Sequence, residues 1–285
     1  MSALGGSDDL LVLSRSALLD ALEALSDQTT AVIVIGAQAI YLHAGNAPVA
    51  LAAATKDSDL VVDPRVLSPE PLLEQAMKRA GFFRNPFNGQ PGAWMNPGGI
   101  PVDLMVPEAL AGSGGKSSRG GRIPPHAKSS TRRARGLEAA IIDNSEMEIR
   151  ALDEADNRRY SALVAGPTAL LIAKLHKIAE RVENPNRLND KDAHDIYRLL
   201  VATETSVITA SLGALLDNSI SQMATVEALG YLRTLFAESP EVLGSLMAGR
   251  AEEGIGDPAN VSLSVSLLAA DVIAGLPTEP AYDSE

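Results

Sequence analysis

The chain has 285 residues, a formal net charge of −12 and no cysteine, and 46% of its residues are hydrophobic. The length fits one large domain or two medium ones, the lack of cysteine excludes disulfides, thiolate nucleophiles and cysteine-ligated zinc, and the acidic charge argues against a broadly basic surface for nucleic acid. No run of about 18 apolar residues is present, and the first residues lack the basic region of a signal peptide, so we expect a cytoplasmic protein without a transmembrane helix.

The N-terminal segment predicts a helix, a strand and a second helix. After a lead at residues 1–8 that we expect to be disordered, residues 10–26 carry leucines at helical spacing and predict an amphipathic helix. Residues 31–35, Ala-Val-Ile-Val-Ile, predict a buried strand. Gly36 then allows a tight turn and a close approach of the backbone to a phosphate, at the start of a helix over residues 37–43. By itself, this glycine fits an ordinary strand-to-helix turn equally well.

Two aspartates, Asp57 and Asp59, follow a small-residue connection at residues 44–54. The apolar residues 60–62 after them predict a second buried strand, in which residues two apart point to the same face. Two carboxylates on one face form a hard oxygen-ligand pair suited to Mg²⁺. The alternative is a pair of solvated carboxylates at a strand edge.

The segment after this strand alternates turns with short elements. Ser68, followed by Pro and Glu, predicts the start of a helix that runs to Arg79. Residues 82–99, rich in Asn, Pro and Gly, predict a hairpin, and residues 100–106 predict a short strand. A carboxylate inside an apolar strand is unfavourable unless it is paired or bound to a metal, so Asp103 in this strand is the candidate third carboxylate. The alternative is an edge-strand aspartate that faces water.

Residues 111–136 are rich in Gly, Ser, Lys and Arg and contain no Asp or Glu. Such segregation in an acidic protein predicts a mobile basic loop that meets a polyanion, such as RNA or a triphosphate. The alternative is a solvated loop without a partner. A P-loop is excluded, because Ala111 stands where the Walker pattern requires glycine. The seven cations of the loop are Lys116, Arg119, Arg122, Lys128, Arg132, Arg133 and Arg135.

The second half of the sequence is helical in pattern. Residues 137–142 and 147–151 predict two more strands, and residues 163–168 mark the passage into the helical half. Residues 205–275 predict three or four Leu- and Ala-rich helices, and residues 276–285 form an acidic tail that we expect to be disordered.

A helix predicted over residues 168–182 carries Lys174, Lys177 and Arg181 on one stripe. Three cations on one stripe suit a triphosphate or a nucleic-acid backbone, and the alternative is a solvated helix face. The next predicted helix starts at Asp190, the expected N-cap, and runs to about Val201, with Asp192 in its first turn. The alternative for Asp192 is a carboxylate that only stabilises the helix N-terminus.

The order of these motifs resembles the nucleotidyltransferase fold of the polymerase-β type, and more closely its AbiEii and MenT-like toxin branch, from type IV toxin–antitoxin systems. The likeness spans about residues 30–200. In that branch a lysine helix, a short loop and an Arg/Lys-Asp-x-x-Asp sequence follow one another, as they do at residues 174–195. The residues that carry the likeness are Gly36, Asp57, Asp59, Asp103, Lys174 and Asp192.

The resemblance implies an α/β N-terminal nucleotidyltransferase domain with a mixed sheet over residues 1–160. It implies a helical C-terminal domain over residues 161–285 that completes an active site in the cleft between the two. The implied reaction moves NMP from an NTP to a hydroxyl acceptor, and pyrophosphate leaves. The implied acceptor is RNA, in particular tRNA, and the implied role is that of a toxin with a cognate antitoxin protein.

The resemblance also implies roles for individual residues. The expected ligands of two Mg²⁺ ions are Asp57, Asp59 and Asp103, and the expected catalytic partners are Lys174 and Asp192. Nucleotide binding is expected at Gly36, Ala37, Lys177 and Arg181. Acceptor binding is expected at Arg132, Arg133 and Arg135 in the basic loop.

Ala37 departs from the family pattern, in which Gly or Ser follows the first glycine and helps to hold the triphosphate. Without that hydroxyl, backbone N–H groups and the side chain of Gln38 remain as donors. The departure leaves open a non-catalytic relative that only binds a partner. A further alternative is a nucleotidyltransferase that acts on a small molecule such as an antibiotic.

Overall fold

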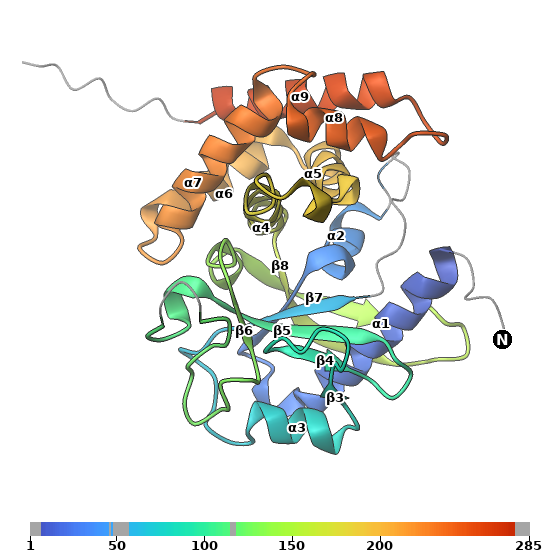
Figure 1. The fold of residues 1–285 in the computed structure, drawn as a ribbon, viewed down its shortest axis with the longest axis vertical. Coiled ribbons are helices and arrows are strands. Elements are labelled where there is room, and N and C mark those ends of the chain that lie inside the picture. The colour runs from blue at the N-terminus through green and yellow to red at the C-terminus, as the bar shows by residue number, and fades with distance from the viewer. Residues whose placement is uncertain (1–6, 46, 48–56, 115–117, 277–285) are drawn as a thin grey trace, which may run out of the picture.

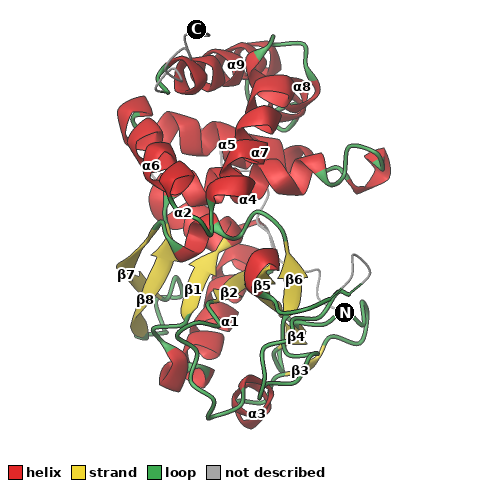
Figure 2. Cartoon of the chain, turned by 90° about the vertical axis from the view of Figure 1, so that its left-hand side faces the viewer, coloured by secondary structure: helices red, strands yellow, loops and turns green. Residues whose placement is uncertain are grey.

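The computed structural model describes residues 7–45, 47, 57–114 and 118–276. Most of the expected N-terminal lead, of the small-residue connection and of the acidic tail lies outside these residues, as does Lys116 of the basic loop. Within them the chain is α/β, with a mixed sheet followed by a mostly helical C-terminal part (Figure 1). Figure 2 shows the strands grouped in one half of the molecule and the later helices stacked on it.

One mixed sheet runs through the N-terminal part. Its strands in spatial order are β3 (Phe83–Arg84), β4 (Ala93–Met95), β5 (Pro101–Pro107), β2 (Ser58–Val62), β1 (Val32–Ile35), β8 (Arg159–Ala165) and β7 (Asn144–Arg150). The pairs β2–β5 and β1–β8 are parallel, whereas β1–β2, β3–β4, β4–β5 and β7–β8 are antiparallel. The hairpin expected over residues 82–99 is the β3–β4 pair.

A short eighth strand, β6 (Arg132–Ala134), lies beside β5 and parallel to it. β4 pairs with residues 101–103 of β5, and β6 pairs with residues 105–107 of the same strand. The two short strands therefore share one edge of β5. This arrangement brings the end of the basic loop against the strand that carries Asp103.

The central strand β1 corresponds to the apolar run at residues 31–35 of the sequence. All four of its residues are buried, because β2 and β8 flank it and helices cover the sheet. The helices α1 (Ser7–Ala24) and α3 (Leu73–Arg79) pack against each other, and α1 also contacts β2, β5 and β8. Figure 1 shows α3 at the bottom of the molecule, below the sheet, and the helical part at the top.

The helix α2 (Gly36–Ala44) joins the two parts, since it contacts β1 and β2 on one side and α4 and α5 on the other. A buried polar network fixes α2 to α1. Arg15 Nε donates to Gln38 Oε1 at 2.7 Å, and Gln38 Nε2 donates to Ser14 Oγ at 2.7 Å. Gln38 therefore has partners inside the protein, which corrects its interpretation as a donor for a triphosphate.

The C-terminal part consists of helices that share one apolar core. They are α4 (Pro167–Ala179), α5 (Asp190–Ala202), α6 (Thr205–Asp217), α7 (Gln222–Leu232), a π-helical turn (Arg233–Ala237), α8 (Leu243–Arg250) and α9 (Pro258–Ala274). Ile196, Phe236 and Val265 lie in this core. Asn189, and not Asp190, caps α5, because its side chain accepts a hydrogen bond from the Lys191 backbone N–H.

Three predicted boundaries differ from the structure. The helix expected from Ser68 begins at Leu73, and Ser68 lies before it, where its backbone N–H and carbonyl both bond to the Gln28 side chain. Within residues 137–142, where a strand was expected, Ala139–Ile141 form a 3₁₀ turn. The passage expected at residues 163–168 contains the end of β8, so the sheet extends past the predicted boundary at residue 160.

The basic loop is also more ordered than expected. Within its described residues it contains β6 and the buried side chains of Ile123, His126 and Thr131. The Glu74 carboxylate on α3 accepts hydrogen bonds from the Ser130 hydroxyl and the Ala127 N–H. Among the described residues, no single helix is long and apolar enough to cross a membrane, and only the bent pair α5–α6 meets that test jointly.

Candidate functional site

Three aspartates gather where β2 and β5 run side by side. In the parallel β2–β5 pair, Asp59 stands opposite Asp103, so the two side chains lie on the same face of the sheet. Asp57 precedes β2 and is two residues from Asp59. The intervening Ser58 points the other way, where its buried hydroxyl donates to the Ser14 carbonyl at 2.8 Å. The same-face arrangement expected from the Asp-x-Asp spacing therefore extends to Asp103.

Gly36 brings the start of α2 against this aspartate group. Its φ is +68°, and a Cβ at this position would lie 2.3 Å from Asp59 Oδ2. Both the backbone conformation and the contact with the carboxylate therefore require glycine. Ala37 follows in the first turn of α2, where its side chain offers no hydrogen bond. The tight turn expected at Gly36 is present, and the group beside its backbone is the carboxylate of Asp59; the approach of this backbone to a phosphate stays a prediction.

The aspartates are electrostatically unfavourable in the absence of a cation. Burial and the neighbouring Asp59 charge raise the pKa of Asp103 to about 7, although Arg132 opposes the shift. Loss of hydration and the Asp59 charge also raise the pKa of Asp57. The negative charges on this wall of the site are thus only partly compensated.

Arg132 compensates one of them. From β6 its Nη2 donates to Asp103 Oδ2 at 2.8 Å. The sequence interpretation grouped Arg132 with Arg133 and Arg135 as acceptor-binding residues of a mobile loop, and the structure separates the three. Arg133 Nη1 donates to the Gly112 carbonyl at 2.9 Å, and Arg135 forms an ion pair with Glu227 of α7.

Across from the aspartates, two lysines of α4 and an arginine in the turn after it converge on one carboxylate of α5. Asp192 accepts hydrogen bonds from Lys174 Nζ at 2.7 Å, from Lys177 Nζ at 2.8 Å and from Arg181 Nη1 at 3.4 Å. Lys174 Nζ also donates to Asp195 Oδ2 at 2.7 Å. The three cations of the predicted stripe therefore share a buried partner, and Lys177 is the most exposed of the three.

In this ion network the pKa of the carboxylate shifts in the opposite direction from the pKa values of Asp57 and Asp103. Burial alone would raise the pKa of Asp192, but Lys174 and Lys177 hold it well below the usual range. Burial likewise opposes the charge of Lys174, yet Asp195 and Asp192 raise its pKa above the usual value. Lys174 is almost fully buried and two of its three donors are used. It is placed to hold Asp192 and Asp195, with little freedom to reach a ligand.

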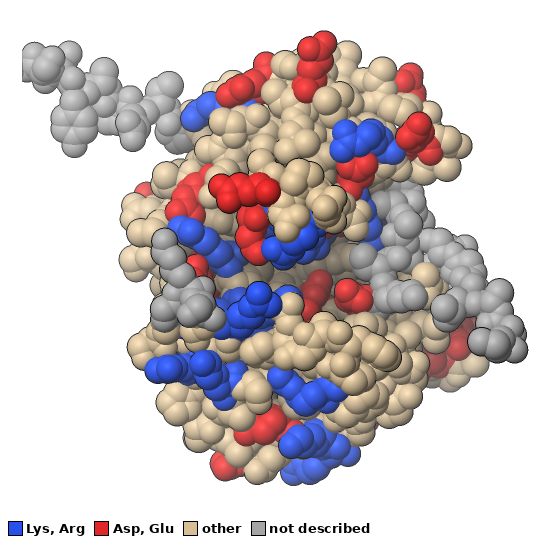
Figure 3. All heavy atoms as spheres, in the orientation of Figure 1, with Lys and Arg blue, Asp and Glu red and all other residues tan. Residues whose placement is uncertain are grey.

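Two lysines of the helical part lie close enough to the aspartates for their charges to affect the pKa values of the aspartates. The positive charges of Lys177 and Lys191 lower the pKa of Asp57 against the other influences on it, and Lys177 acts on Asp103 in the same way. Burial lowers the pKa of Lys191 to about 8, and burial followed by the Lys174 charge lowers that of Lys177. The space-filling view shows a hollow between the two parts, bordered by basic and acidic side chains (Figure 3).

Lys191 and Asp195 received no role from the sequence, although both belong to the Lys-Asp-x-x-Asp motif that was noted there. A spacing of three residues places Asp192 and Asp195 on one face of α5, and this was the available signal. The signal did not indicate which lysine would face each carboxylate. That information depends on how α4 and α5 pack, which is a property of the tertiary structure.

The donor set fits a divalent metal in its chemistry. Hard carboxylate oxygens are the ligands that Mg²⁺ prefers, and Asp57 and Asp59 would hold such an ion beside Asp103. The described residues nevertheless contain no group of three or more His, Asp or Glu side chains already arranged around a metal position. Asp103 Oδ2 is bonded to Arg132 instead.

Comparison of the chain with protein-family models, with curated proteins and with solved structures gives no match. The function of the cleft is therefore inferred from its residues and their geometry.

Proposed function

We propose that the protein is a Mg²⁺-dependent nucleotidyltransferase that moves NMP from an NTP to a hydroxyl of RNA. The single observation that carries the proposal is the in-register pair of Asp59 and Asp103, with Asp57 beside it and the cationic helices opposite. Carboxylates that disfavour one another favour a bound divalent cation, and lysines across the cleft favour an anionic substrate. A metal–triphosphate complex supplies both the cation and the anion.

The proposed reaction forms one bond and breaks one. The acceptor oxygen attacks the α-phosphorus of the NTP, the bond from that phosphorus to the bridging oxygen of the β-phosphate breaks, and pyrophosphate leaves. Magnesium held by Asp57 and Asp59 would supply Lewis-acid stabilisation of the phosphate charge. Asp103 has a pKa of about 7, which suits a group that accepts the proton of the attacking hydroxyl near neutral pH.

The helical wall would position and neutralise the triphosphate. Lys177 is 42% exposed at its side chain and Lys191 is partly exposed, so both can reach a ligand in the cleft. Arg181 also keeps donors beyond its bond to Asp192. Lys174 would act through Asp192 and Asp195, whose positions it determines. In this proposal Lys174 is a positioning residue, although the resemblance assigns it direct contact with phosphate.

The cellular role follows from the resemblance and is proposed with it. A cytoplasmic enzyme that adds nucleotides to tRNA would slow growth, and a cognate antitoxin protein would counteract it. A small-molecule acceptor is the second candidate for the transfer reaction. A non-catalytic binding protein is the third, and the observation that favours it is the absence of a hydroxyl at Ala37.

The experiment that tests the proposal is transfer of label from each of the four α-labelled NTPs to total RNA, with magnesium present. We expect one or more nucleotides to be transferred, and Asp59→Asn to reduce the rate by roughly three orders of magnitude. Glu154→Gln, which removes an exposed carboxylate outside the cleft, should not change the rate. Equal labelling by the wild type and the Asp59 variant would refute the proposed site.

Expression in a bacterial host separates the cellular role from the chemistry. Slow growth with the wild type and normal growth with Asp59→Asn would support the toxin assignment. Transfer in vitro without any effect on growth would favour a small-molecule or other non-toxic role.

A further inference from the structure

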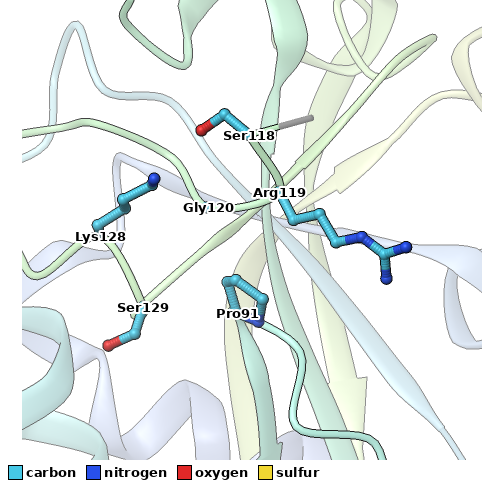
Figure 4. Close-up of a pocket in the computed structure, with 6 residues that line it drawn as sticks. All are labelled: Pro91, Ser118, Arg119, Gly120, Lys128 and Ser129. Atoms are coloured by element: carbon cyan, nitrogen blue, oxygen red, sulfur yellow. The ribbon is translucent and has the colours of Figure 1, made fainter. Parts of the chain in front are cut away.

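A second hollow lies at the edge of the sheet, beside β6, and has a volume of about 330 Å³ (Figure 4). It is formed by three separate segments of the chain and contains no acidic residue. Figure 4 shows Arg119 and Lys128 on either side of the Gly120 backbone. The residues that line the pocket are Pro91, Ser118, Arg119, Gly120, Lys128 and Ser129.

Backbone contacts hold the walls of this pocket in place. The Arg133 N–H donates to the Arg119 carbonyl at 2.8 Å, and the Gly92 N–H donates to the Ser129 carbonyl at 2.9 Å. A Cβ on Gly120 would lie 2.3 Å from the Lys128 carbonyl oxygen, so the two segments approach as closely as they do only because residue 120 is glycine. The pocket is therefore preformed, whereas the sequence predicted a mobile loop here.

The charge of the pocket is positive and uncompensated. Among the described residues, neither Arg119 nor Lys128 forms an ion pair with a carboxylate. Arg84 adds a third cation behind the wall, where it bonds the backbone carbonyls of Ser129 and Gln90 and lies over the Trp94 ring. In a chain with a net charge of −12, this local excess favours an anion.

Hydroxyl groups narrow the class of anion. Ser129 is exposed in the pocket wall, and Ser118 Oγ is buried without a hydrogen-bond partner in the described part of the chain. The Arg119 and Lys128 side chains lie on opposite sides of Gly120 (Figure 4), so the guanidinium and the ammonium group fit neighbouring phosphates of a polyanion. The open shape suits a phosphate that belongs to a longer chain better than it suits an enclosed small ligand.

The position of the pocket relative to the aspartates identifies the chain that it would hold. Gly120 forms a bridge with Arg132, and Arg132 pairs with Asp103. Gly120 is thus one strand beyond β6, or about 10 Å from β5 at the usual spacing between strands. An acceptor with its hydroxyl at Asp103 would pass over this edge. The triphosphate would extend the other way, toward Lys177 and Lys191.

We propose that the pocket at Arg119 and Lys128 binds a phosphodiester of the RNA acceptor, next to the nucleotide that carries the reacting hydroxyl. The inference rests on the proposed nucleotidyl transfer to RNA and adds to it the surface that recognises the acceptor. Recognition of phosphate fixes the register of the strand and reads no base. The pocket therefore contributes affinity for single-stranded RNA of any sequence.

The test uses the full chain and a short labelled single-stranded RNA, with binding measured by fluorescence anisotropy between about 0.05 and 0.3 M salt. We expect Arg119→Gln combined with Lys128→Gln to weaken RNA binding roughly tenfold. The slope of log affinity against log salt should become shallower by about 0.7 for each contact removed. The affinity for labelled NTP should stay within about twofold of the wild type.

The matched control removes two exposed cations outside the basic loop, by Arg159→Gln and Lys78→Gln. This pair changes the net charge equally but lies outside the pocket lining, and it should leave the salt slope close to that of the wild type. Thermal unfolding of both double variants checks that they are folded.

Three results would overturn the inference. The wild type could fail to bind RNA, the pocket variant could bind RNA as the control variant does, or the pocket variant could lose NTP affinity and keep RNA affinity. In each case, transfer of label from NTP still tests the nucleotidyltransferase proposal separately, because the Asp59→Asn comparison does not depend on the pocket.

Discussion

The cleft has one wall formed by the sheet and one formed by the helical part, and both carry aspartates and basic residues. The pKa shifts of the aspartates have opposite signs on the two walls. On the sheet wall, Asp57, Asp59 and Asp103 have one arginine in contact, and the pKa values of Asp57 and Asp103 are raised. On the helical wall, Asp192 is surrounded by cations, and its pKa is depressed. The presence of aspartates on both walls does not distinguish them, whereas the direction of the pKa shift does.

The difference in pKa shift indicates which wall is suited to bind a cation. Carboxylates with raised pKa values are destabilised in their charged form, so binding of a cation there is favourable. The Asp192 network is already satisfied by hydrogen bonds and ion pairs, so its main effect is to hold α4 against α5. We therefore expect substitutions on the sheet wall to affect function and substitutions in the buried network to affect stability.

The largest expected effect on stability comes from Lys174→Met. This substitution leaves the buried Asp195 carboxylate without the lysine that pairs with it, and loss of one partner from a buried pair typically costs about 3–5 kcal/mol. Urea unfolding at neutral pH measures the change. Lys177→Met is the matched control, because it removes a partly exposed lysine that contacts the same Asp192 oxygen.

For Lys177→Met we expect a loss below about 1 kcal/mol, as is typical of exposed ion pairs. Equal destabilisation by the two substitutions would contradict the division between a buried scaffold lysine and a cleft-facing one.

Local patterns in the sequence were sufficient for most of the fold. The apolar run of β1, the hairpin of β3 and β4 and the helix α4 were predicted because each depends on neighbouring residues and their periodicity. The mixed sheet and the helical second part are confirmed. The 3₁₀ turn at residues 139–141 was wrongly expected to be a strand, since a short buried apolar run does not distinguish these conformations.

Only the parts of the candidate site that depend on local spacing could be predicted from the sequence. The spacing of Asp57 and Asp59 is local, and so is the stripe of cations on α4. The pairing of Asp59 with Asp103 depends on strand register, and the contact of Arg132 with Asp103 depends on which edge β6 joins. Such contacts between distant segments leave no periodic signal, so Arg132 was assigned to the acceptor and Lys191 received no role.

A smaller effect on stability is expected at Asp103, and its sign depends on pH. The folded-state pKa of about 7 lies above the ordinary value, so the carboxyl group contributes most to stability below pH 4, and this contribution is lost as the pH rises through 7. Asp103→Asn removes the titration. Without metal, we expect the variant to be more stable than the wild type by about 1–2 kcal/mol at pH 8.

The measurement is urea unfolding with a metal chelator at about pH 4 and about pH 8. At the lower pH the two proteins should have similar stability, because Asp103 is then protonated. A variant that is less stable than the wild type at both values would show that the Arg132 ion pair outweighs the repulsion among the aspartates.

The smallest expected effect is a shift in one limb of the pH profile of nucleotidyl transfer, caused by Lys191→Arg. In the wild type, kcat/KM should rise as Asp103 loses its proton and fall as Lys191 loses its charge near pH 8. Arginine stays charged throughout this range, so the variant should keep the rising limb and lose the fall near pH 8. Lys78→Arg, on the exposed face of α3, is the control and should retain the bell shape. An unchanged falling limb in the Lys191 variant would mean that a group other than Lys191 supplies the positive charge on which this limb depends.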